Sequence, residues 1–305
     1  MKFKDITIND KKEIELYTKQ TNYFLCDYCF TDIFLWRYNY STKFCIENDF
    51  LFLKIKTKEE KKEMYLTPLG KGDLKSAITS IIEDAKTKEI PFVMLSVPEK
   101  LKSEIEEIMP DTFIFTETPE NADYIYLAEN MINLSGKKLH SKRNFINRFK
   151  EVYENRWSYE DITDKNIEEV FKYQLDWYEE NRKISNDNSL FSEISVIATA
   201  LKNFNELDLK GGLLRIDGKI VAFTLASKSF EDMYTIQIEK AEHSINGAYQ
   251  MINNEFAKRN FQDVKYVDRE EDLGIEGLRK AKQSYKPVLM GINYTAVLKN
   301  DPFSK

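Results

Sequence analysis

The chain has 305 residues, of which 42% are hydrophobic and 31% charged, with a formal net charge of −6. This composition is typical of globular proteins, and the length exceeds that of one ordinary core, so we expect two domains. We expect neither a signal peptide nor a membrane span, since no window approaches the roughly 18 apolar residues that a membrane helix needs. These features predict a cytoplasmic protein with no membrane partner, and the acidic balance argues against general coating of nucleic acid.

The three cysteines indicate a reducing compartment. Three cysteines, an odd and small number, do not indicate a disulfide framework. Cys26 and Cys29 do have the C-x-x-C spacing of redox and zinc motifs. A redox motif needs a preceding strand, and a zinc site needs a second ligand pair in a chain whose only histidines are His140 and His243. We therefore expect small buried apolar side chains and no metal.

The first half of the chain begins with helical sequence and continues with strands. The spacing of Leu74, Ala77, Ile78, Ile81 and Ile82 predicts an amphipathic helix. The complete series is helices near 8–19 and 29–39, strands at 43–48, 49–56 and 62–68, a helix at 74–85, a strand at 91–97, a helix at 98–108, and strands at 113–118 and 123–129.

The second half shows the same order of elements. Asp217-Gly218 between two strand-like runs predicts a hairpin. The series is helices near 137–151, 164–181 and 191–205, strands at 212–217, 219–229 and 232–240, a helix at 247–259, a strand at 264–269, a helix at 275–284 and a strand at 293–299. The repetition predicts two domains of similar architecture, at residues 1–134 and 135–305.

This order of elements resembles the GNAT acyltransferase fold, and two copies resemble the Fem-type aminoacyltransferases. The stretches "CDYCFTDIFLWR", "GKKLHSKRNFINRF", "INGAYQMINNEFA" and "DREEDLGIEGLRKAKQSYKP" are similar to the family named for the C-terminal domain of phosphatidylglycerol lysyltransferase. The resemblance covers nearly the whole chain. It implies an α/β (α+β) protein of two tandem GNAT-like (acyl-CoA N-acyltransferase) domains, each a mixed sheet flanked by helices.

The implied activity is transfer of an acyl or aminoacyl group to an amine or hydroxyl acceptor. The expected donor is a coenzyme A thioester, and aminoacyl-tRNA is the less favoured donor. Since these residues hold no membrane segment, we expect a small-molecule acceptor rather than a lipid. The alternative from another class is a degenerate tandem-GNAT protein that binds a ligand or regulates. The oligomeric state is open.

The turn before the helix at 247–259 is the expected site for the donor. The family pattern Q/R-x-x-G-x-G/A falls here on His243-Ser244-Ile245-Asn246-Gly247-Ala248. Free N–H groups at a helix N-terminus bind phosphate, and the resemblance implies coenzyme A contacts. The contacts expected from this turn and the strand before it are Ile238, Glu239, His243, Asn246, Gly247 and Ala248. An ordinary strand-to-helix turn is the alternative. The matching turn of the first half carries Asp73, which would itself occupy those N–H groups.

Acidic residues follow the strand at 264–269. We expect Glu270 or Glu271 to take a proton from the acceptor amine, and Asp268 to contact the acceptor. Tyr285 would protonate the leaving thiolate, as tyrosines near that place do in many GNAT enzymes. The alternatives are a solvated acidic loop and a packed aromatic residue.

The helix near 137–151 carries six Lys or Arg and no acid within residues 136–150. Its positive charge is spread over several faces, and Lys142 falls beside the apolar stripe. One face combines His140, Arg143, Asn144 and Asn147 at i, i+3, i+4 and i+7. We expect these four residues to bind a polar or anionic substrate, with a plain solvated face as the alternative.

Overall fold

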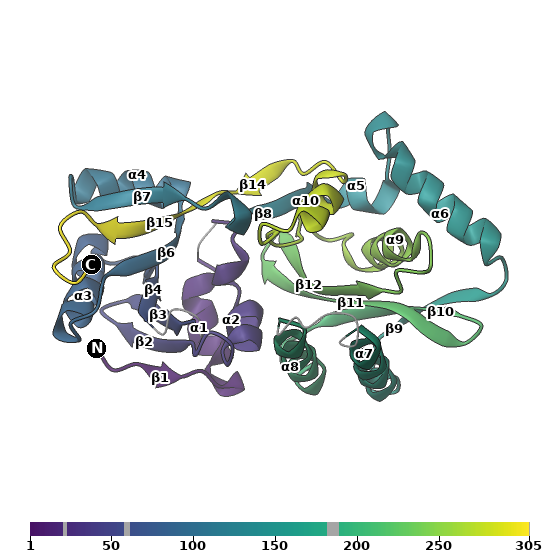
Figure 1. The fold of residues 1–305 in the computed structure, drawn as a ribbon, viewed down its shortest axis with the longest axis horizontal. Coiled ribbons are helices and arrows are strands. Elements are labelled where there is room, and N and C mark those ends of the chain that lie inside the picture. The colour runs from purple at the N-terminus through teal and green to yellow at the C-terminus, as the bar shows by residue number, and fades with distance from the viewer. Residues whose placement is uncertain (21–22, 58–61, 182–188, 305) are drawn as a thin grey trace. The chain divides into compact units, whose positions relative to one another are not determined.

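A computed structural model of the chain describes residues 1–20, 23–57, 62–181 and 189–304 (Figure 1). The chain forms two compact units, and neither is a single continuous segment. The first unit contains residues 1–123, 271–274 and 290–305, and the second contains residues 124–270 and 275–289. Within the described ranges, no helix has both the length and the apolar character needed to cross a membrane.

The first unit is built on a mixed sheet with the strand order β1-β2-β3-β4-β6-β15-β7, and β5 pairs with β3. β4 and β6 are parallel, whereas β15 is antiparallel to both β6 and β7. The strands are β1 (Lys4–Asp5), β2 (Lys43–Glu47), β3 (Phe50–Lys56), β4 (Glu63–Leu66), β5 (Leu69–Gly70), β6 (Val93–Pro98), β7 (Phe113–Glu117) and β15 (Asn293–Leu298).

Helices supply the apolar side chains that cover this sheet. The predicted stripe of α3 is confirmed, because Ala77, Ile78, Ile81 and Ile82 are buried in a cluster with Phe92 and Met94. The helices are α1 (Lys11–Thr18), α2 (Phe30–Trp36), α3 (Leu74–Thr87) and α4 (Glu99–Ile108), with 3-10 turns η1 (Ile8–Asp10), η2 (Cys26–Tyr28) and η3 (Pro119–Asn121). The spacing of apolar residues therefore fixes which helix face meets the sheet.

The second unit is built on a sheet with the strand order β14-β8-β13-β12-β11-β10-β9. β12 and β13 are parallel, and β9 to β12 are successive antiparallel neighbours. The predicted hairpin is confirmed, since Asp217 and Gly218 have φ angles of 50° and 80°. The strands are β8 (Asp123–Leu127), β9 (Trp157–Asp161), β10 (Lys210–Ile216), β11 (Lys219–Phe230), β12 (Met233–Ala241), β13 (Tyr266–Asp268) and β14 (Leu289–Gly291).

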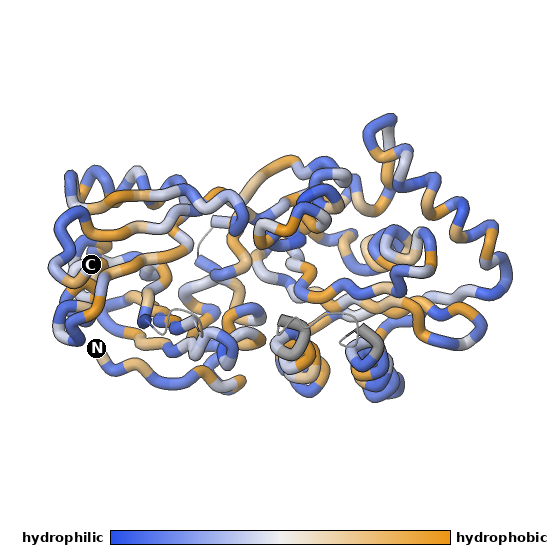
Figure 2. The backbone as a smooth tube through the Cα atoms, in the orientation of Figure 1, coloured by the Kyte–Doolittle hydropathy of each residue, from blue (hydrophilic) through white to orange (hydrophobic). Residues whose placement is uncertain are grey.

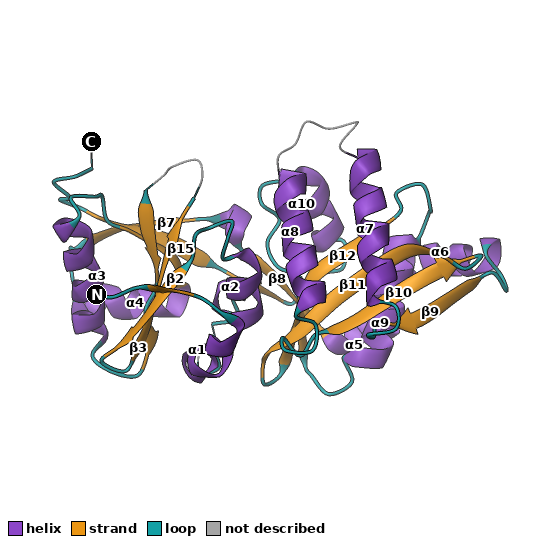
Figure 3. Ribbon diagram, turned by 90° about the horizontal axis from the view of Figure 1, so that it is seen from below, coloured by secondary structure: helices purple, strands orange, loops and turns teal. Residues whose placement is uncertain are grey.

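Helices cover both faces of the second sheet (Figures 1 and 3). α7 and α8 lie on one face, and α9 lies on the other, against α5 and α6. Hydrophobic stretches follow the strands between these layers (Figure 2), and Met251, Ile252 and Phe256 of α9 are fully buried there. The helices are α5 (Ala128–Asn133), α6 (His140–Val152), α7 (Ile167–Asn181), α8 (Ser189–Lys202), α9 (Ala248–Asn260) and α10 (Glu276–Gln283), with the 3-10 turn η4 (Lys137–Leu139).

The predicted mixed α/β class is confirmed, but two strands join the other sheet. β8 comes from the first half of the sequence and pairs with β13, whereas the last strand, β15, pairs with β6 and β7. The contacts thus divide the chain differently from a single boundary between residues 134 and 135. Alternating apolar residues identify a strand but not its partner, because any paired strand presents the same pattern.

Candidate active site

The parallel strands β12 and β13 part in the second unit. Their register pairs end at Thr235 with Asp268, while β12 continues to Ala241. Past Asp268 the pairing with β12 ends, so the last part of β12 has a neighbouring strand, β11, on one side only. In open sheets with parallel strands, ligands bind where neighbouring strands separate. We therefore take this end of β12 as the candidate site.

A β-bulge lies on β12 at the same place. Leu225 of β11 pairs with Ile238 and Ala226 pairs with Ile236, which leaves Gln237 as an extra residue. The Gln237 amide nitrogen donates to Ser227 Oγ at 2.9 Å. A bulge interrupts the hydrogen-bond ladder and re-aims the neighbouring side chains, and bulges are frequent beside active sites.

Glu239, two residues further along β12, joins three elements. Its Oε1 accepts a hydrogen bond from Arg269 Nη2 at 2.7 Å, immediately after β13. Its Oε2 accepts one from Asn253 Nδ2 of α9 at 2.8 Å. The side chains of Glu239 and Arg269 are only 10% and 13% exposed. This nearly buried ion pair links the two strands beyond the point where their pairing ends.

Two polar atoms of this hydrogen-bonded group, and one on the β-bulge, are buried and unused. Gln237 Oε1, Asn253 Oδ1 and Arg269 Nη1 have no hydrogen-bond partner among the residues that the structure describes. Leaving a buried polar atom unpaired costs roughly 1–3 kcal/mol, and more when the group is charged. Such atoms are rare in folded proteins, and a missing ligand is one cause. Both a hydrogen-bond acceptor and a cationic donor are thus available around Glu239.

Lys142 of α6 adds a second buried cation. Its ammonium lies 4.3 Å from the centre of the Tyr285 ring, and the Arg269 guanidinium lies 5.0 Å from that ring. Burial, and next the Arg269 charge, lower the pKa of Lys142 to about 8. Tyr285 is buried against Tyr126, and this burial raises the pKa of the Tyr285 hydroxyl, which therefore stays protonated at neutral pH.

The predicted donor turn leads from β12 into α9. Gly247 is the N-cap with φ 87°, and a side chain there would meet the Phe145 carbonyl oxygen of α6, 2.7 Å from its Cβ. α9 has neither a side-chain cap nor an acid in its first turn. His243 and Asn246 are exposed, and the His243 ring lies 5.7 Å from the Tyr249 ring. The helix N-terminus is thus compatible with an anion.

The matching helix of the first unit is closed by its own residue. As expected, Asp73 caps α3, and its carboxylate accepts from the Ser76 backbone N–H at 3.2 Å and from the Ser76 hydroxyl at 2.6 Å. These hydrogen bonds lower the pKa of Asp73, so the carboxylate stays charged. A phosphate would be repelled there.

The polar face of α6 is connected mainly to its own helix and to the end of α5. Arg143 donates to the carbonyl oxygens of Leu134 and Gly136, the latter at 2.8 Å. His140 lies 3.5 Å from Arg143 and 3.2 Å from Asn144 through its two ring nitrogens. Asn147 is exposed. Arg143 therefore anchors α6 to α5, and substrate binding by these four residues stays a prediction.

The predicted acids separate in the structure. Asp268 is fully buried, and its Oδ1 accepts from the Glu270 backbone N–H at 2.8 Å. Glu270 has a positive φ of 58° and ends the segment that belongs to the second unit, whereas Glu271 belongs to the first unit. The catalytic roles of Glu270, Glu271 and Tyr285 stay predictions, but only Tyr285 lies in the cluster around Glu239.

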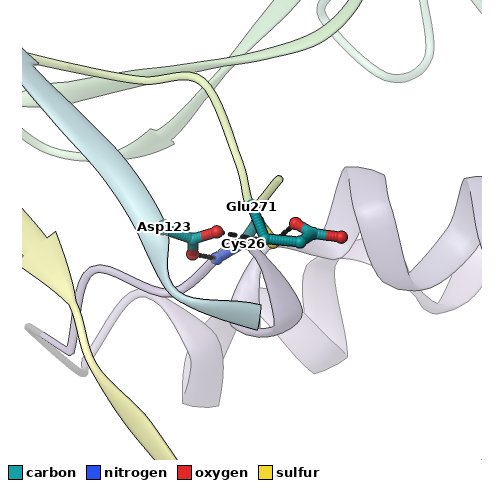
Figure 4. A group of neighbouring side chains, drawn as sticks. All are labelled: Cys26, Asp123 and Glu271. Carbon is teal, nitrogen blue, oxygen red and sulfur yellow. Dashed lines mark hydrogen bonds between the residues drawn. The ribbon is translucent and has the colours of Figure 1, made fainter. Parts of the chain in front are cut away.

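Glu271 meets Cys26 and Asp123 within the first unit (Figure 4). Cys26 Sγ lies 3.4 Å from Asp123 Oδ1 and 3.6 Å from Glu271 Oε2, and the Cys26 backbone N–H donates to Asp123 Oδ2 at 2.7 Å. The three candidate ligand atoms lie within 4.8 Å of one another. Sulfur and carboxylate oxygen are zinc ligands. The Cys26 backbone N–H already donates to Asp123, whereas the single thiol proton can serve only one of the two carboxylates. The expected absence of a metal stays a prediction.

Sequence reasoning missed much of the cluster around Glu239. Lys142, Asn253 and Arg269 were not predicted as site residues, and Glu239 was predicted only as a donor contact. A signal existed for Lys142, which lies in line with Leu139, Ile146 and Phe149 on an otherwise apolar face of α6. A charged residue on a buried stripe is costly and often functional.

The model of the family "Phosphatidylglycerol lysyltransferase, C-terminal" matches residues 18–297. A curated relative, the uncharacterized protein MYCGA3080 of Mycoplasmoides gallisepticum, is 25% identical over 167 residues. That match covers 55% of this chain and 53% of the relative, so the chain spans about half the length of the relative. The family match covers most of the chain.

Solved structures confirm the fold. A conserved protein of unknown function from Bacteroides thetaiotaomicron is 42% identical with a TM-score of 0.92, covering 97% of this chain and 99% of that one. L-PGS from Bacillus licheniformis is 16% identical with a TM-score of 0.60, covering 95% and 92%. A tandem GNAT protein from the clavulanic acid biosynthesis pathway is 9% identical with a TM-score of 0.51, covering 97% and 98%. The predicted tandem GNAT-like fold is therefore confirmed.

Proposed function

Because the chain belongs to the phosphatidylglycerol lysyltransferase C-terminal family, whose fold is that of acyl- and aminoacyl-transferases, we propose that it transfers an acyl group to an amine. The observation that carries this proposal is the cluster around Glu239, where β12 and β13 part. The cluster combines a carboxylate that can take a proton, a protonated tyrosine and unpartnered polar atoms. Those are the groups that acyl transfer to an amine requires.

The donor that we propose is a coenzyme A thioester. It is supported by the α9 N-terminus, which starts at Gly247 without a side-chain cap and without an acid in its first turn. The pyrophosphate of coenzyme A would accept hydrogen bonds from the free N–H groups there. The thioester end would then extend along β12 toward Gln237 and Glu239, past Ile238 and Ala248.

The reaction that we propose forms one C–N bond and breaks one C–S bond. Glu239 takes a proton from the acceptor ammonium, and the free amine attacks the thioester carbonyl carbon. Tyr285 gives its proton to the departing coenzyme A sulfur. The nitrogen loses its second proton as the tetrahedral intermediate collapses, this proton returns to the Tyr285 phenolate, and Glu239 releases its proton to solvent. We assign the base to Glu239 rather than to Glu270 or Glu271, because Glu239 lies beside the unpartnered atoms Asn253 Oδ1 and Arg269 Nη1.

A second donor, an aminoacyl-tRNA, is supported by the family description and by exposed basic residues. Lys137 and Lys138 of η4 and Arg148 of α6 are exposed, and no acid lies within residues 136–150. A tRNA donor would transfer its aminoacyl group from an ester, with a ribose hydroxyl as leaving group. Phosphate contacts by these basic residues would make the affinity strongly dependent on salt.

Calorimetry with coenzyme A tests the favoured donor. Asn246 is exposed beside the start of α9, so Asn246→Asp adds negative charge there without a steric change. We expect wild-type protein to bind coenzyme A and Asn246→Asp to bind it at least about tenfold more weakly. Asn133→Asp, at an exposed position on α5, is the matched control and should bind as the wild type does. Equal binding by both variants, or none by the wild type, would reject this donor site.

A further inference from the structure

We infer that the acceptor is an α-amino acid, whose carboxylate binds between Lys142 and Arg269 and whose amine lies at Asn253. This inference rests on the proposed function, because it names the acceptor of that reaction. It comes from the charges and the unused hydrogen-bonding atoms of the cluster around Glu239, all of which belong to the second unit.

The cluster has an excess of positive charge. Lys142 and Arg269 both lie against the Tyr285 ring, and Glu239 is the carboxylate that pairs with Arg269. Lys142 is only 7% exposed and lies within no salt bridge of the described residues, although the Glu239 charge acts on it at longer range. A buried, unpaired ammonium is costly, and the face of an aromatic ring offsets only part of that cost. An anion bound beside Lys142 would neutralise it.

The two unpartnered atoms on Arg269 and Asn253 have opposite hydrogen-bonding character. Glu239 holds Arg269 Nη2 on one oxygen and Asn253 Nδ2 on the other, at 2.7 and 2.8 Å. Arg269 Nη1 and Asn253 Oδ1 are therefore near the same carboxylate, the first a cationic donor and the second an acceptor. A ligand that satisfies both must present an acceptor to Arg269 and a donor to Asn253, and an anionic acceptor would also neutralise Lys142.

An α-amino acid presents a carboxylate and an N–H donor a few atoms apart, whereas inorganic phosphate carries its hydroxyl donor on the same phosphorus as its negative charge. A carboxylate suits the guanidinium of Arg269 as well as the ammonium of Lys142. Its amine, next to Asn253 Oδ1, would lie close to Glu239, the residue that we propose takes the proton. Recognition of the acceptor and its activation are then performed by adjacent groups.

Calorimetry with the donor-free protein tests this inference. The probes are the standard L-amino acids, their carboxamides, the corresponding decarboxylated amines, and inorganic phosphate. We expect at least one amino acid to bind, and its carboxamide and its decarboxylated amine to bind at least about tenfold more weakly, since each lacks the carboxylate. Equal binding of the carboxamide, binding of phosphate in preference to every amino acid, or no binding of any amino acid would overturn the inference.

Lys142→Met gives the residue-level test, because methionine keeps the length of the side chain and removes its charge. We expect binding of the amino acid to weaken at least about tenfold, with the thermal midpoint unchanged or higher. Lys138→Met, at an exposed position before α6, is the matched control and should bind normally. If Lys142→Met did not fold, Lys142→Gln would be measured instead, and full binding by the folded variant would contradict the inference.

These results distinguish the inference from the proposed function. Binding is measured without a donor, whereas acyl transfer is measured as thiol released from acetyl-coenzyme A. If thiol were released with other amines but no amino acid bound, the inference would fail and the function would stand. If an amino acid bound and no thioester or aminoacyl ester were consumed, the proposed function would fail while the binding site remained.

Discussion

The N-termini of α3 and α9 occupy corresponding places in the two units, and they differ in one chemical respect. α3 is closed by its own residue, since Asp73 accepts from the Ser76 N–H. α9 begins at Gly247 with no side-chain cap. An internal carboxylate completes the first helix, whereas the second leaves its positive end available to an external anion. In two units of similar architecture, the N-terminus of α3 is therefore structural, whereas the N-terminus of α9 is a candidate donor site.

The polar clusters of the two units differ in the same sense. In the first unit, Asp123 and Glu271 both lie within hydrogen-bonding distance of Cys26, so these three side chains are partners of one another. Elsewhere in that unit, Arg37 Nε and Asn39 Nδ2 have no hydrogen-bond partner among the described residues. In the second unit, Gln237, Asn253 and Arg269 each retain a buried atom without a partner among the described residues. Side chains that partner one another have a structural role, and unused buried atoms beside a parting of strands are where we propose that a ligand binds. Variants in each unit test this contrast.

The largest effect is expected from Glu239→Gln in the second unit. Glutamine keeps the shape of the side chain and removes its basicity, so turnover should fall roughly 10²–10⁴-fold. Coenzyme A binding should be unchanged. Rates of thiol release from acetyl-coenzyme A, measured with a working acceptor, provide the test. Glu276→Gln, at a highly exposed position on α10, is the control. Full activity of Glu239→Gln would show that Glu239 is not the base.

Charge changes at the two helix N-termini should have opposite outcomes. Asn246→Asp should weaken coenzyme A binding at least about tenfold. Asp73→Ala should leave that binding intact and lower the stability of the first unit, because a cap is lost. Calorimetry and thermal unfolding measure the two effects. Loss of coenzyme A binding in Asp73→Ala alone would move the donor to the first unit.

We expect the Lys142 side chain to lower the free energy of unfolding while it contributes to binding of the proposed amino acid. Folding lowers the pKa of Lys142 from 10.5 to about 8, so the unfolded chain binds more protons between about pH 8 and 10.5. The destabilisation caused by burying the charged Lys142 is complete below pH 8, and it disappears as the pH rises through that window. Lys142→Met should therefore raise the free energy of unfolding at pH 7 by roughly 1–3 kcal/mol and remove this pH dependence. A destabilised variant, in urea unfolding at pH 7 and 10, would contradict this.

The smallest effect is expected for tRNA. With coenzyme A as donor, wild-type protein should show no tight, salt-dependent tRNA binding. Charge reversal at the exposed Lys137, Lys138 and Arg148 should then change nothing measurable. Fluorescence anisotropy at several salt concentrations is the measurement. Submicromolar tRNA binding by the wild type at physiological salt would make aminoacyl-tRNA the favoured donor. The charge reversals should then weaken that binding and flatten its salt dependence.

Much of the fold could be predicted from the sequence, because apolar spacing and turn residues are local. The stripe of α3 and the Asp217-Gly218 hairpin are confirmed. The exchange of β8 and β15 between the sheets could not be predicted, since strand pairing depends on contacts far apart in the sequence. The cluster around Glu239 could not be predicted for the same reason, because its members come from four separate parts of the sequence: Lys142, Glu239, Asn253 and Arg269. Lys142 alone left a signal, as a charge in line with an apolar stripe.

Hydrogen–deuterium exchange in the presence and absence of acetyl-coenzyme A tests most directly which unit holds the donor. The comparison concerns the backbone amides of residues 243–250, before and within the first turn of α9, and of residues 72–78 at the start of α3. We predict slower exchange at residues 243–250 when acetyl-coenzyme A is present, and no change at residues 72–78. Protection at the start of α3, or no protection at either helix at saturating ligand, would contradict the account.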